Sequence, residues 1–336
     1  MSNDALRVGV DLDGSLESLG NSMNDLADAL TEMGGYELVR FRTLHSPDAP
    51  NECRPTARAL WAPWWRHGLG RSIDLVLPPV DIVHVAGIAT PPTKSVPLII
   101  SVDDLRPLRS ESRIHQRITQ LRRATARGAF LAASSRTASH EVLQVLGVRR
   151  HQVVVVPPAV PHVATTSDGE DLVINVTGAV ELFLSLAPDL VDFARAHDTR
   201  VVALMSTEAS SLVRMRASSV IVRARRDARD ALASARVVLH FSDGARFPSF
   251  AIAALAAGVP TIARATSINR ELLDGAAALA ASDREMVDLL ESIWDSSARR
   301  AIMVAAGRSR AVDYAPATAA QAYAALYHDA VRGWRQ

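Results

Sequence analysis

Residues 241–263, FSDGARFPSFAIAALAAGVPTIA, carry the clearest structural signals in the chain. An apolar strand pattern gives way to a short polar loop, and a segment of good helix formers starts at Ser249, a residue type favoured as an N-cap. Gly258 then stops the helix, and Pro260 follows at the start of the apolar run 259–265. The order strand, loop, helix, strand predicts one parallel β-α-β unit.

The same alternation runs along the whole chain. In the first half it predicts strands at 7–12, 36–41, 81–87, 96–104, 129–134 and 152–158, and helices at 21–34, 114–128 and 136–147. In the second half it predicts strands at 172–178, 200–206, 218–224, 235–242 and 259–265, and helices at 180–196, 226–234, 249–257, 283–294 and 316–333. Alternating strands and helices imply parallel sheets with right-handed crossovers.

The polar stretch 162–172, HVATTSDGEDL, has the composition of a linker and separates the two series. We therefore expect two Rossmann-like doubly wound domains, over 1–163 and 164–315, with a C-terminal helix in 316–336 that packs back on the first domain. Ligands of such sheets bind at the carboxyl ends of the strands. With two domains, the cleft that they face across is the expected site.

Composition narrows the class of protein. The 336 residues are 48% hydrophobic, which suffices for a large core, and a formal net charge of +1 gives no argument for a nucleic-acid partner. Cys53 is the single cysteine, so no internal disulfide can form. The first residues lack a signal-peptide pattern, and no apolar run reaches about 18 residues, the length of a spanning helix. We expect a cytoplasmic protein.

Five stretches, taken in order, resemble the retaining glycosyltransferases of family four, which have the GT-B fold. The segments are VGVDLDGSLESLGNSMNDLADAL (8–30), DIVHVAG (81–87), PLIISVDDLRPLR (97–109), FLAASSRTASHEVLQVLGVRRHQVVVVPPAV (130–160) and ARDALASARVVLHFSDGARFPSFAIAALAAGVPTIARATSINRELL (228–273). The resemblance spans most of the chain. It implies transfer of a sugar from a nucleoside-diphosphate sugar bound on the second domain, with no further cofactor.

The resemblance also exposes departures from the family's pattern. Two glutamates of the family, one at the donor sugar and one at the ribose, correspond to Ala245 and Ala253. The family's histidine before an aspartate corresponds to Asp103, with Asp104 after it. The basic pair expected after INVTG is replaced by AVELFLSLA, which contains no lysine or arginine. Each departure removes a donor-site group and leaves the strand and helix pattern intact.

Four residues are candidates for holding the donor phosphates. Amides at the helix start around Ser249 and Phe250 suit an anion, and Arg246 lies three residues before Ser249. Gly20 would let the first loop approach a ligand closely. The alternatives are a simple helix cap, a solvated arginine and a turn glycine.

Two residues are catalytic candidates. His84 ends an apolar strand that faces the predicted cleft, although a satisfied structural histidine is the commoner case. Asp103 could hold an acceptor hydroxyl, or it could cap the following turn. No spacing of histidine, cysteine, aspartate and glutamate indicates a metal site.

Acceptor or partner contacts are predicted on the first domain. WAPWW supplies Trp61, Trp64 and Trp65, which stack well on sugars and lipids but could also anchor the loop. The segment 109–128 carries Arg109, Arg113, Arg117, Arg122, Arg123 and Arg127. Arg113 and Arg117 share a helix face that could meet anionic lipid at a membrane surface, an acidic partner protein, or only solvent.

Three functions follow as alternatives. The first is a glycosyltransferase with a rebuilt donor site that uses backbone amides and Arg246. The second is an inactive protein of the same fold that serves as auxiliary subunit of an active glycosyltransferase. The third is a module that binds a sugar or nucleotide without turnover. Fold resemblance favours the first, and the missing charged residues favour the second.

Overall fold

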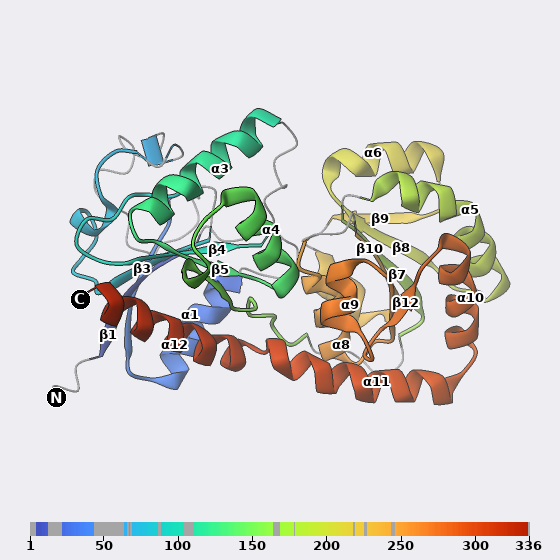
Figure 1. Ribbon diagram of the computed structural model, residues 1–336. Coiled ribbons are helices and arrows are strands. Elements are labelled where there is room, and N and C mark those ends of the chain that lie inside the picture. The colour runs from blue at the N-terminus through green and yellow to red at the C-terminus, as the bar shows by residue number, and fades with distance from the viewer. Residues whose placement is uncertain are drawn as a thin grey trace. The chain divides into compact units, whose positions relative to one another are not determined.

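The computed structural model describes residues 5–12, 22–43, 64, 65, 67, 69–86, 89–103, 111–163, 169–177, 179–217, 219–224, 227–242 and 246–334. The chain forms two compact units (Figure 1). Unit 1 contains the described residues up to Ala159 and, in addition, the segment that begins at Pro316. Unit 2 extends from Val160 to Ala315.

Unit 1 is built on a parallel sheet in the order β2-β1-β3-β4-β5-β6. Its strands are β1 (Leu6–Asp11), β2 (Tyr36–Phe41), β3 (Ile82–Val85), β4 (Leu98–Val102), β5 (Phe130–Ala133) and β6 (Val153–Val155). Its helices are α1 (Ser22–Met33), η1 (Ile73–Leu75), α3 (Glu111–Ala126), α4 (Arg136–Leu146), η2 (Arg150–Gln152) and α12 (Pro316–Trp334).

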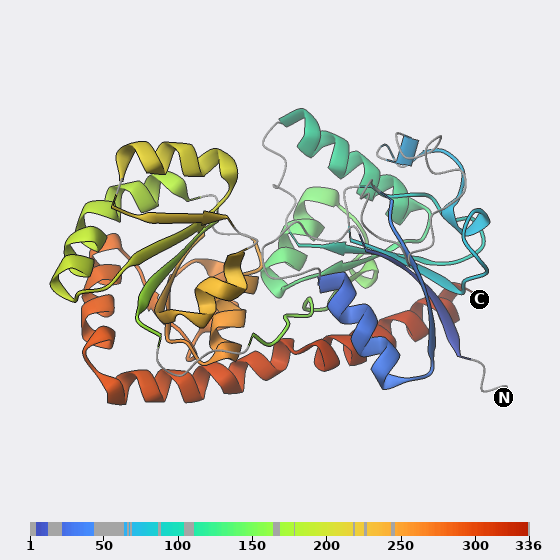
Figure 2. The same ribbon diagram turned by 180° about the vertical axis from the view of Figure 1, so that it is seen from behind.

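Two separate layers of side chains cover the two faces of this sheet. On one face, Met23, Leu26 and Leu30 of the amphipathic helix α1 are buried together with side chains of α12. On the other face, Leu121 of α3 and Val142 of α4 belong to a second buried cluster. The turned view in Figure 2 shows α1 and α12 on one side of the strands and α3 and α4 on the other.

Helix α12 is an integral part of unit 1 although it comes from the far end of the chain. Eight of its side chains are buried against the sheet and α1: Ala319, Ala320, Tyr323, Ala324, Leu326, Tyr327, Ala330 and Val331. Polar contacts add to this packing, because His328 Nε2 lies 3.1 Å from the Tyr36 hydroxyl. The indole of Trp334 donates a hydrogen bond of 3.1 Å to the carbonyl of Ser95.

Unit 2 is built on a second parallel sheet, in the order β12-β11-β10-β7-β8-β9. Its strands are β7 (Asp171–Thr177), β8 (Val201–Met205), β9 (Ile221–Ala224), β10 (Ala235–Ser242), β11 (Thr261–Arg264) and β12 (Ala278–Ala280). Its helices are α5 (Val180–Ala196), α6 (Thr207–Arg216), α7 (Ala228–Ala233), α8 (Ser249–Ala257), α9 (Ser267–Leu273), α10 (Asp283–Trp294), α11 (Ser297–Ala311) and η4 (Val312–Tyr314).

Helix α8 is the most deeply buried helix segment of unit 2. All its residues except Ser249 and Ala256 are buried, as expected of a helix that is apolar all round. Gly258 ends it in the left-handed conformation, with φ at 80°. Helix α11 packs closely on α8 because Gly307 has no side chain: a Cβ there would lie 2.9 Å from a methyl group of Leu255.

The predicted elements occur in the structure, mostly with shorter strands. Helix α8, helix α5 and strand β10 have the predicted bounds, whereas the strand predicted at 81–87 covers only Ile82–Val85. Three α-helices and one strand were not predicted, namely α6, α9, α11 and β12, and neither were the short helices η1, η2 and η4. Helix α11, SARRAIMVAAGRSRA, mixes exposed and buried apolar residues, which hides its periodicity. Among the described residues, no helix has both the length and the apolar character needed to cross a bilayer.

Candidate functional site

The carboxyl edge of the unit 2 sheet is the region where a doubly wound fold binds its ligand. Helix α8 starts there, immediately after the loop that follows β10. Ser249 is the first residue of the helix rather than its N-cap, which is Pro248 and makes no side-chain capping bond. The cap prediction was wrong by one position, since the N-cap is Pro248, whose side chain has no acceptor for a capping bond.

The first turn of α8 offers backbone donors. The amide of Ser249 donates to the carbonyl of Phe247 at 2.9 Å, and that of Ile252 to the carbonyl of Pro248 at 3.0 Å. Within the described residues, the amides of Phe250 and Ala251 have no hydrogen-bond partner, as is usual in a first helical turn. Unbonded amides at a helix start suit an anion.

The side chains around this turn differ in what they can offer. Phe250 is buried in the core of unit 2, so only its backbone can face a ligand. Arg246 is partly exposed and lies just before the turn. Gly20 and Ala245 lie outside the described residues. Of the donor-side candidates, Arg246 and the amides near Ser249 therefore lie close together along the described chain.

Ala253, which the resemblance aligns with one of the two glutamates of the family-four enzymes, is completely buried. Its side chain is 0% exposed and lies in the core cluster that contains Phe250 and Ile268. A ligand cannot touch this position without repacking the core. A carboxylate there would also lose its hydration without gaining a partner.

Two polar residues near this edge were not found from the sequence. Asn175 of β7 and His240 of β10 are buried on neighbouring strands, and Asn175 Nδ2 lies 3.1 Å from His240 Nδ1. Each interrupts an apolar strand, LVINVT and VVLHFS respectively, and that interruption is the signal that could have revealed them. The two side chains lie opposite each other on β7 and β10, the two longest strands, at the centre of the sheet.

On unit 1, the equivalent edge carries two carboxylates. Asp103 follows β4, is half-buried, and accepts a hydrogen bond of 2.7 Å from the Ser134 hydroxyl; Asp104 lies outside the described residues. Asp11 ends β1 and is fully buried. It accepts bonds from the Thr43 hydroxyl at 2.7 Å and the Thr43 amide at 3.2 Å, which ties β1 to the chain that leaves β2.

His84 lies inside unit 1 with both ring nitrogens engaged. Its Nδ1 lies 2.7 Å from the Tyr327 hydroxyl, and its Nε2 lies 2.8 Å from the Ser101 hydroxyl, which is 2.9 Å from that of Tyr323. The imidazole has no exposed surface, and burial lowers the pKa of His84 to about 3. This placement favours the structural alternative, since a reacting group would need access to substrate.

The pH dependence of unit 1 stability tests this role of His84. The unfolded chain binds a proton at this histidine below its ordinary pKa of 6.5, and the folded chain does so only near a pKa of about 3. The free energy of unfolding therefore falls as the pH drops through this window, by about 2 kcal/mol between pH 7 and pH 5. We expect urea unfolding of His84→Gln to lack this component.

The matched control for that measurement is His140→Gln, because His140 is an exposed histidine of the same unit. It should keep the pH dependence of the unsubstituted protein. Equal pH dependence in His84→Gln and the unsubstituted protein would show that His84 is not held neutral by burial.

The tryptophans of WAPWW have different environments. Trp65 is fully buried, and its indole donates a hydrogen bond of 2.9 Å to the carbonyl of Arg71. Trp64 is 54% exposed. Trp61 lies outside the described residues. Trp65 therefore anchors the segment, and Trp64 is the one tryptophan of the described part of the motif that offers its ring to solvent.

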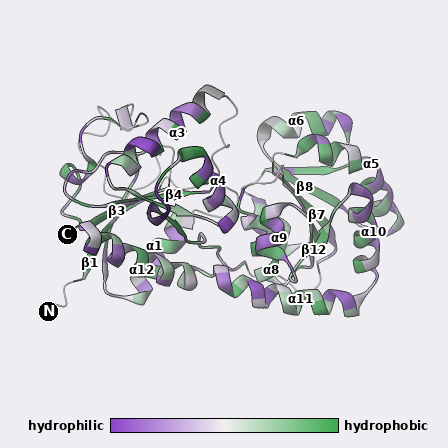
Figure 3. Cartoon of the chain, in the orientation of Figure 1, coloured by the Kyte–Doolittle hydropathy of each residue, from purple (hydrophilic) through white to green (hydrophobic). Residues whose placement is uncertain are grey.

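The arginines of α3 bond to neighbouring parts of unit 1. Arg117 donates to the Thr90 hydroxyl at 2.7 Å, and burial lowers the pKa of Arg117 to about 10. Arg122 donates to the last carbonyls of α4, at Val145 and Leu146, and Arg123 donates to the carbonyl of His67. Hydrophilic residues recur along α3 (Figure 3), yet these three guanidinium groups hold neighbouring backbone and side chains in place. The side chain of Arg113 is outside the described part.

Comparisons with known proteins bear on the fold. No protein-family profile matches the chain, and no curated protein sequence matches it. Solved structures do. Anabaena HepE in complex with UDP-glucose has a TM-score of 0.70 at 13% identity, covering 96% of this chain and 99% of that one. WaaG, a glycosyltransferase involved in lipopolysaccharide biosynthesis, has a TM-score of 0.68 at 14% identity, covering 96% and 99%.

The chain has the GT-B fold. The GT-B prediction is thereby confirmed, together with the two parallel sheets, the second of which has six strands where five were predicted. AviGT4, a glycosyltransferase involved in avilamycin A biosynthesis, is also similar, with a TM-score of 0.62 at 18% identity and 98% of each chain covered.

A GT-B fold does not by itself assign an activity. The N-terminal domain of trehalose-6-phosphate phosphatase from Candida albicans also matches, with a TM-score of 0.65 at 12% identity, covering 98% of this chain and 97% of that one. Its name denotes a phosphatase, so proteins named for different reactions share this fold. Within the described residues, no group of three or more histidine, cysteine, aspartate and glutamate side chains could hold a metal ion.

Proposed function

We propose that this protein is a glycosyltransferase of the retaining family-four type, with its nucleoside-diphosphate sugar bound at the carboxyl edge of unit 2. The first turn of α8 supports the proposal: its amides at Phe250 and Ala251 face no partner among the described residues, and Arg246 lies beside it. Backbone donors and one guanidinium suffice to neutralise a leaving diphosphate. Sugar-nucleotide complexes among the similar structures agree with this assignment.

In the proposed reaction, the bond between the anomeric carbon and the diphosphate breaks, and the acceptor oxygen bonds to that carbon on the same face. The acceptor proton leaves with the diphosphate or with a nearby base. Asp103, which lies at the carboxyl edge of unit 1 and accepts a hydrogen bond from Ser134, is the proposed holder of the acceptor hydroxyl. Trp64 is the proposed aromatic contact of acceptor or partner.

A second function is favoured by one specific observation, the closed side chain of Ala253. A GT-B protein that cannot contact the ribose at this position loses one donor interaction, and each such loss costs on the order of 100-fold or more in rate. Such a protein would act as the inactive auxiliary subunit of another, active glycosyltransferase in the cytoplasm. Trp64 would then contact that partner.

Calorimetric titration with UDP, GDP and ADP, and with their glucose conjugates, separates the two functions. The enzyme should bind one nucleotide at micromolar concentration and release sugar. Arg246→Gln should weaken that binding by about 10-fold or more, because it removes a charge-assisted contact to phosphate. The control is Arg229→Gln, which removes an arginine that precedes β10 in the sequence, whereas Arg246 follows β10. This variant should bind the nucleotide with unchanged affinity. Absence of nucleotide binding together with co-purification of an intact transferase would establish the auxiliary function instead.

A further inference from the structure

The segment that leads into α8 is held from its buried side by an aromatic pair. Phe247 directly follows Arg246 and is only 3% exposed. Its ring lies against the ring of Tyr314, with the two centroids 5.7 Å apart and the ring planes at 68°. Edge-to-face contact is a favoured arrangement of two aromatic rings. Because Phe247 is covalently next to Arg246, this contact restricts where the backbone of Arg246 can lie.

Tyr314 comes from the short helix η4, near the end of unit 2, and connects several parts of that unit. It is buried in the same core cluster as Phe250 of α8. Its hydroxyl donates a hydrogen bond of 3.3 Å to the carbonyl of Leu272 in α9. Its own carbonyl accepts a hydrogen bond of 2.9 Å from the amide of Val160. Tyr314 therefore joins the segment before α8 to helix α9 and to Val160.

Both helices that Tyr314 reaches begin at the carboxyl edge of the unit 2 sheet. Helix α8 follows β10 and helix α9 follows β11, and these two strands are neighbours in the sheet. The proposed donor site lies at the same edge. Since the Tyr314 side chain is buried, it can act on a bound nucleotide only through the residues that it holds, and Phe247 is the one next to Arg246.

Val160 and Tyr314 also lie next to the two points where the chain passes between the units. The chain enters unit 2 at Val160 and leaves it after Ala315. The hydrogen bond from the Val160 amide to the Tyr314 carbonyl joins these two segments within unit 2. Val160 is buried in the same core cluster as Phe247 and Tyr314. A movement of the Phe247 ring is therefore transmitted to Val160 through Tyr314.

We propose that Tyr314 is a positioning residue of the donor site. It holds the ring of Phe247, and thereby keeps Arg246 and the first turn of α8 in one orientation for the diphosphate. A guanidinium that is already oriented loses less conformational freedom when it binds, so the affinity for the nucleotide rises. The role in binding rests on the proposed function, whereas the coupling of Phe247 to Val160 is a property of the folded chain alone.

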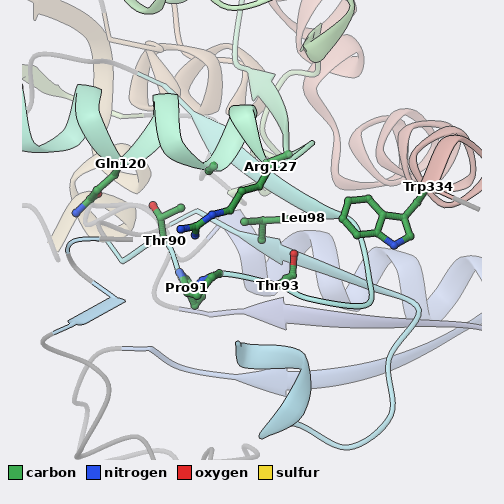
Figure 4. Close-up of a pocket in the computed structure, with 10 residues that line it drawn as sticks. Thr90, Pro91, Thr93, Leu98, Gln120, Arg127 and Trp334 are labelled. Atoms are coloured by element: carbon green, nitrogen blue, oxygen red, sulfur yellow. The ribbon is translucent and has the colours of Figure 1, made fainter. Parts of the chain in front are cut away.

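Two other aromatic side chains supply matched controls. The ring of Phe183 lies edge-to-face against that of Phe241, with the centroids 6.2 Å apart, in the other core cluster of unit 2. Phe183→Leu therefore removes a comparable ring pair from the same unit. Trp334 lies in unit 1, where Figure 4 shows it beside Leu98. Trp334→Phe changes an aromatic contact that lies outside unit 2.

Amide hydrogen exchange measured by NMR tests the coupling without any ligand. In Phe247→Leu, the Val160 amide should exchange at least about 10-fold faster relative to the amides of β7, because Tyr314 loses the ring that fixes it. Taking the ratio to β7 removes the effect of a lower overall stability. Phe183→Leu and Trp334→Phe should leave the ratio as it is in the unsubstituted protein. A ratio that is equal in Phe247→Leu and Phe183→Leu would overturn the coupling.

Calorimetry tests the effect on binding with whichever of UDP, GDP and ADP binds the unsubstituted protein. Tyr314→Leu should weaken that binding by about 10-fold or more. Tyr314→Phe keeps the ring and loses only the hydroxyl, so it should bind within about 3-fold of the unsubstituted protein. Phe183→Leu should bind unchanged, and equal affinity in Tyr314→Leu would overturn the positioning role. If none of the three nucleotides binds, the proposed function fails, and the exchange ratio still decides whether Tyr314 couples Phe247 to Val160.

Discussion

Deletion of residues 316–336 is expected to unfold unit 1 and to leave unit 2 folded. Tyr323, Leu326, Tyr327 and Val331 are large side chains that α12 buries in the core of unit 1. Burial of such a side chain is worth about 1.5–3 kcal/mol, so the four together contribute roughly 6–12 kcal/mol. That sum is comparable to the entire stability of a typical domain, about 5–15 kcal/mol. The deletion also removes the hydroxyl that holds His84.

Hydrogen exchange followed by mass spectrometry measures this prediction for each unit in one sample. In the truncated chain, amides of β1 and α1 should exchange rapidly, whereas amides of β7 and β10 should stay protected. A chain that ends at Trp334 keeps α12 and serves as the control. Protected β1 amides in the truncated chain would show that α12 is dispensable for the core of unit 1.

Ala253→Glu, which introduces the glutamate that the sequence resemblance places at this position, is expected to destabilise unit 2 by about 3 kcal/mol or more. The introduced carboxylate would enter a core that contains Phe250, Ile268 and other apolar side chains, where no partner is available to it. Burial would raise its pKa and favour the neutral form, which still costs an unmatched polar group. Nucleotide affinity should not improve.

Chemical denaturation of unit 2 tests this expectation against Ala256→Glu. Ala256 lies on the same helix but is half-buried, so a longer side chain can reach solvent from it. The control should therefore lose much less stability than Ala253→Glu. If Ala253→Glu folds normally and binds a sugar nucleotide more tightly, helix α8 turns this position toward a ligand, and the auxiliary function loses its support.

Periodicity in the sequence predicted two doubly wound domains because apolar patterns are local, whereas the GT-B fold was expected from the resemblance to the family-four glycosyltransferases. Strand β10 and helices α5 and α8 are each rich in apolar residues, and their bounds were predicted correctly. Helix α11 was missed, since Ile302 is exposed while Gly307, five positions later, is buried. Its apolar residues do not lie on one face, and packing on α8 decides its position instead.

The candidate site was harder to predict because side-chain roles depend on contacts between distant residues. His84 lies at a strand end that suits a ligand, yet Tyr327, 243 residues later, occupies its Nδ1. Arg117, Arg122 and Arg123 form a basic run, but their partners lie in other segments and are mostly backbone carbonyls. No local signal indicates these pairings. In contrast, polar interruptions of apolar strands do indicate Asn175 and His240.

The split course of unit 1 along the chain has a consequence for synthesis. A ribosome makes protein from the N-terminus, and domains generally fold in that order. Here the strands of unit 1 emerge before unit 2, but the helix that completes their core is translated after all of unit 2. Unit 2 can therefore fold while unit 1 still lacks α12 and exposes one apolar face of its sheet. A nascent chain released before α12 is made would expose that face to chaperones and proteases.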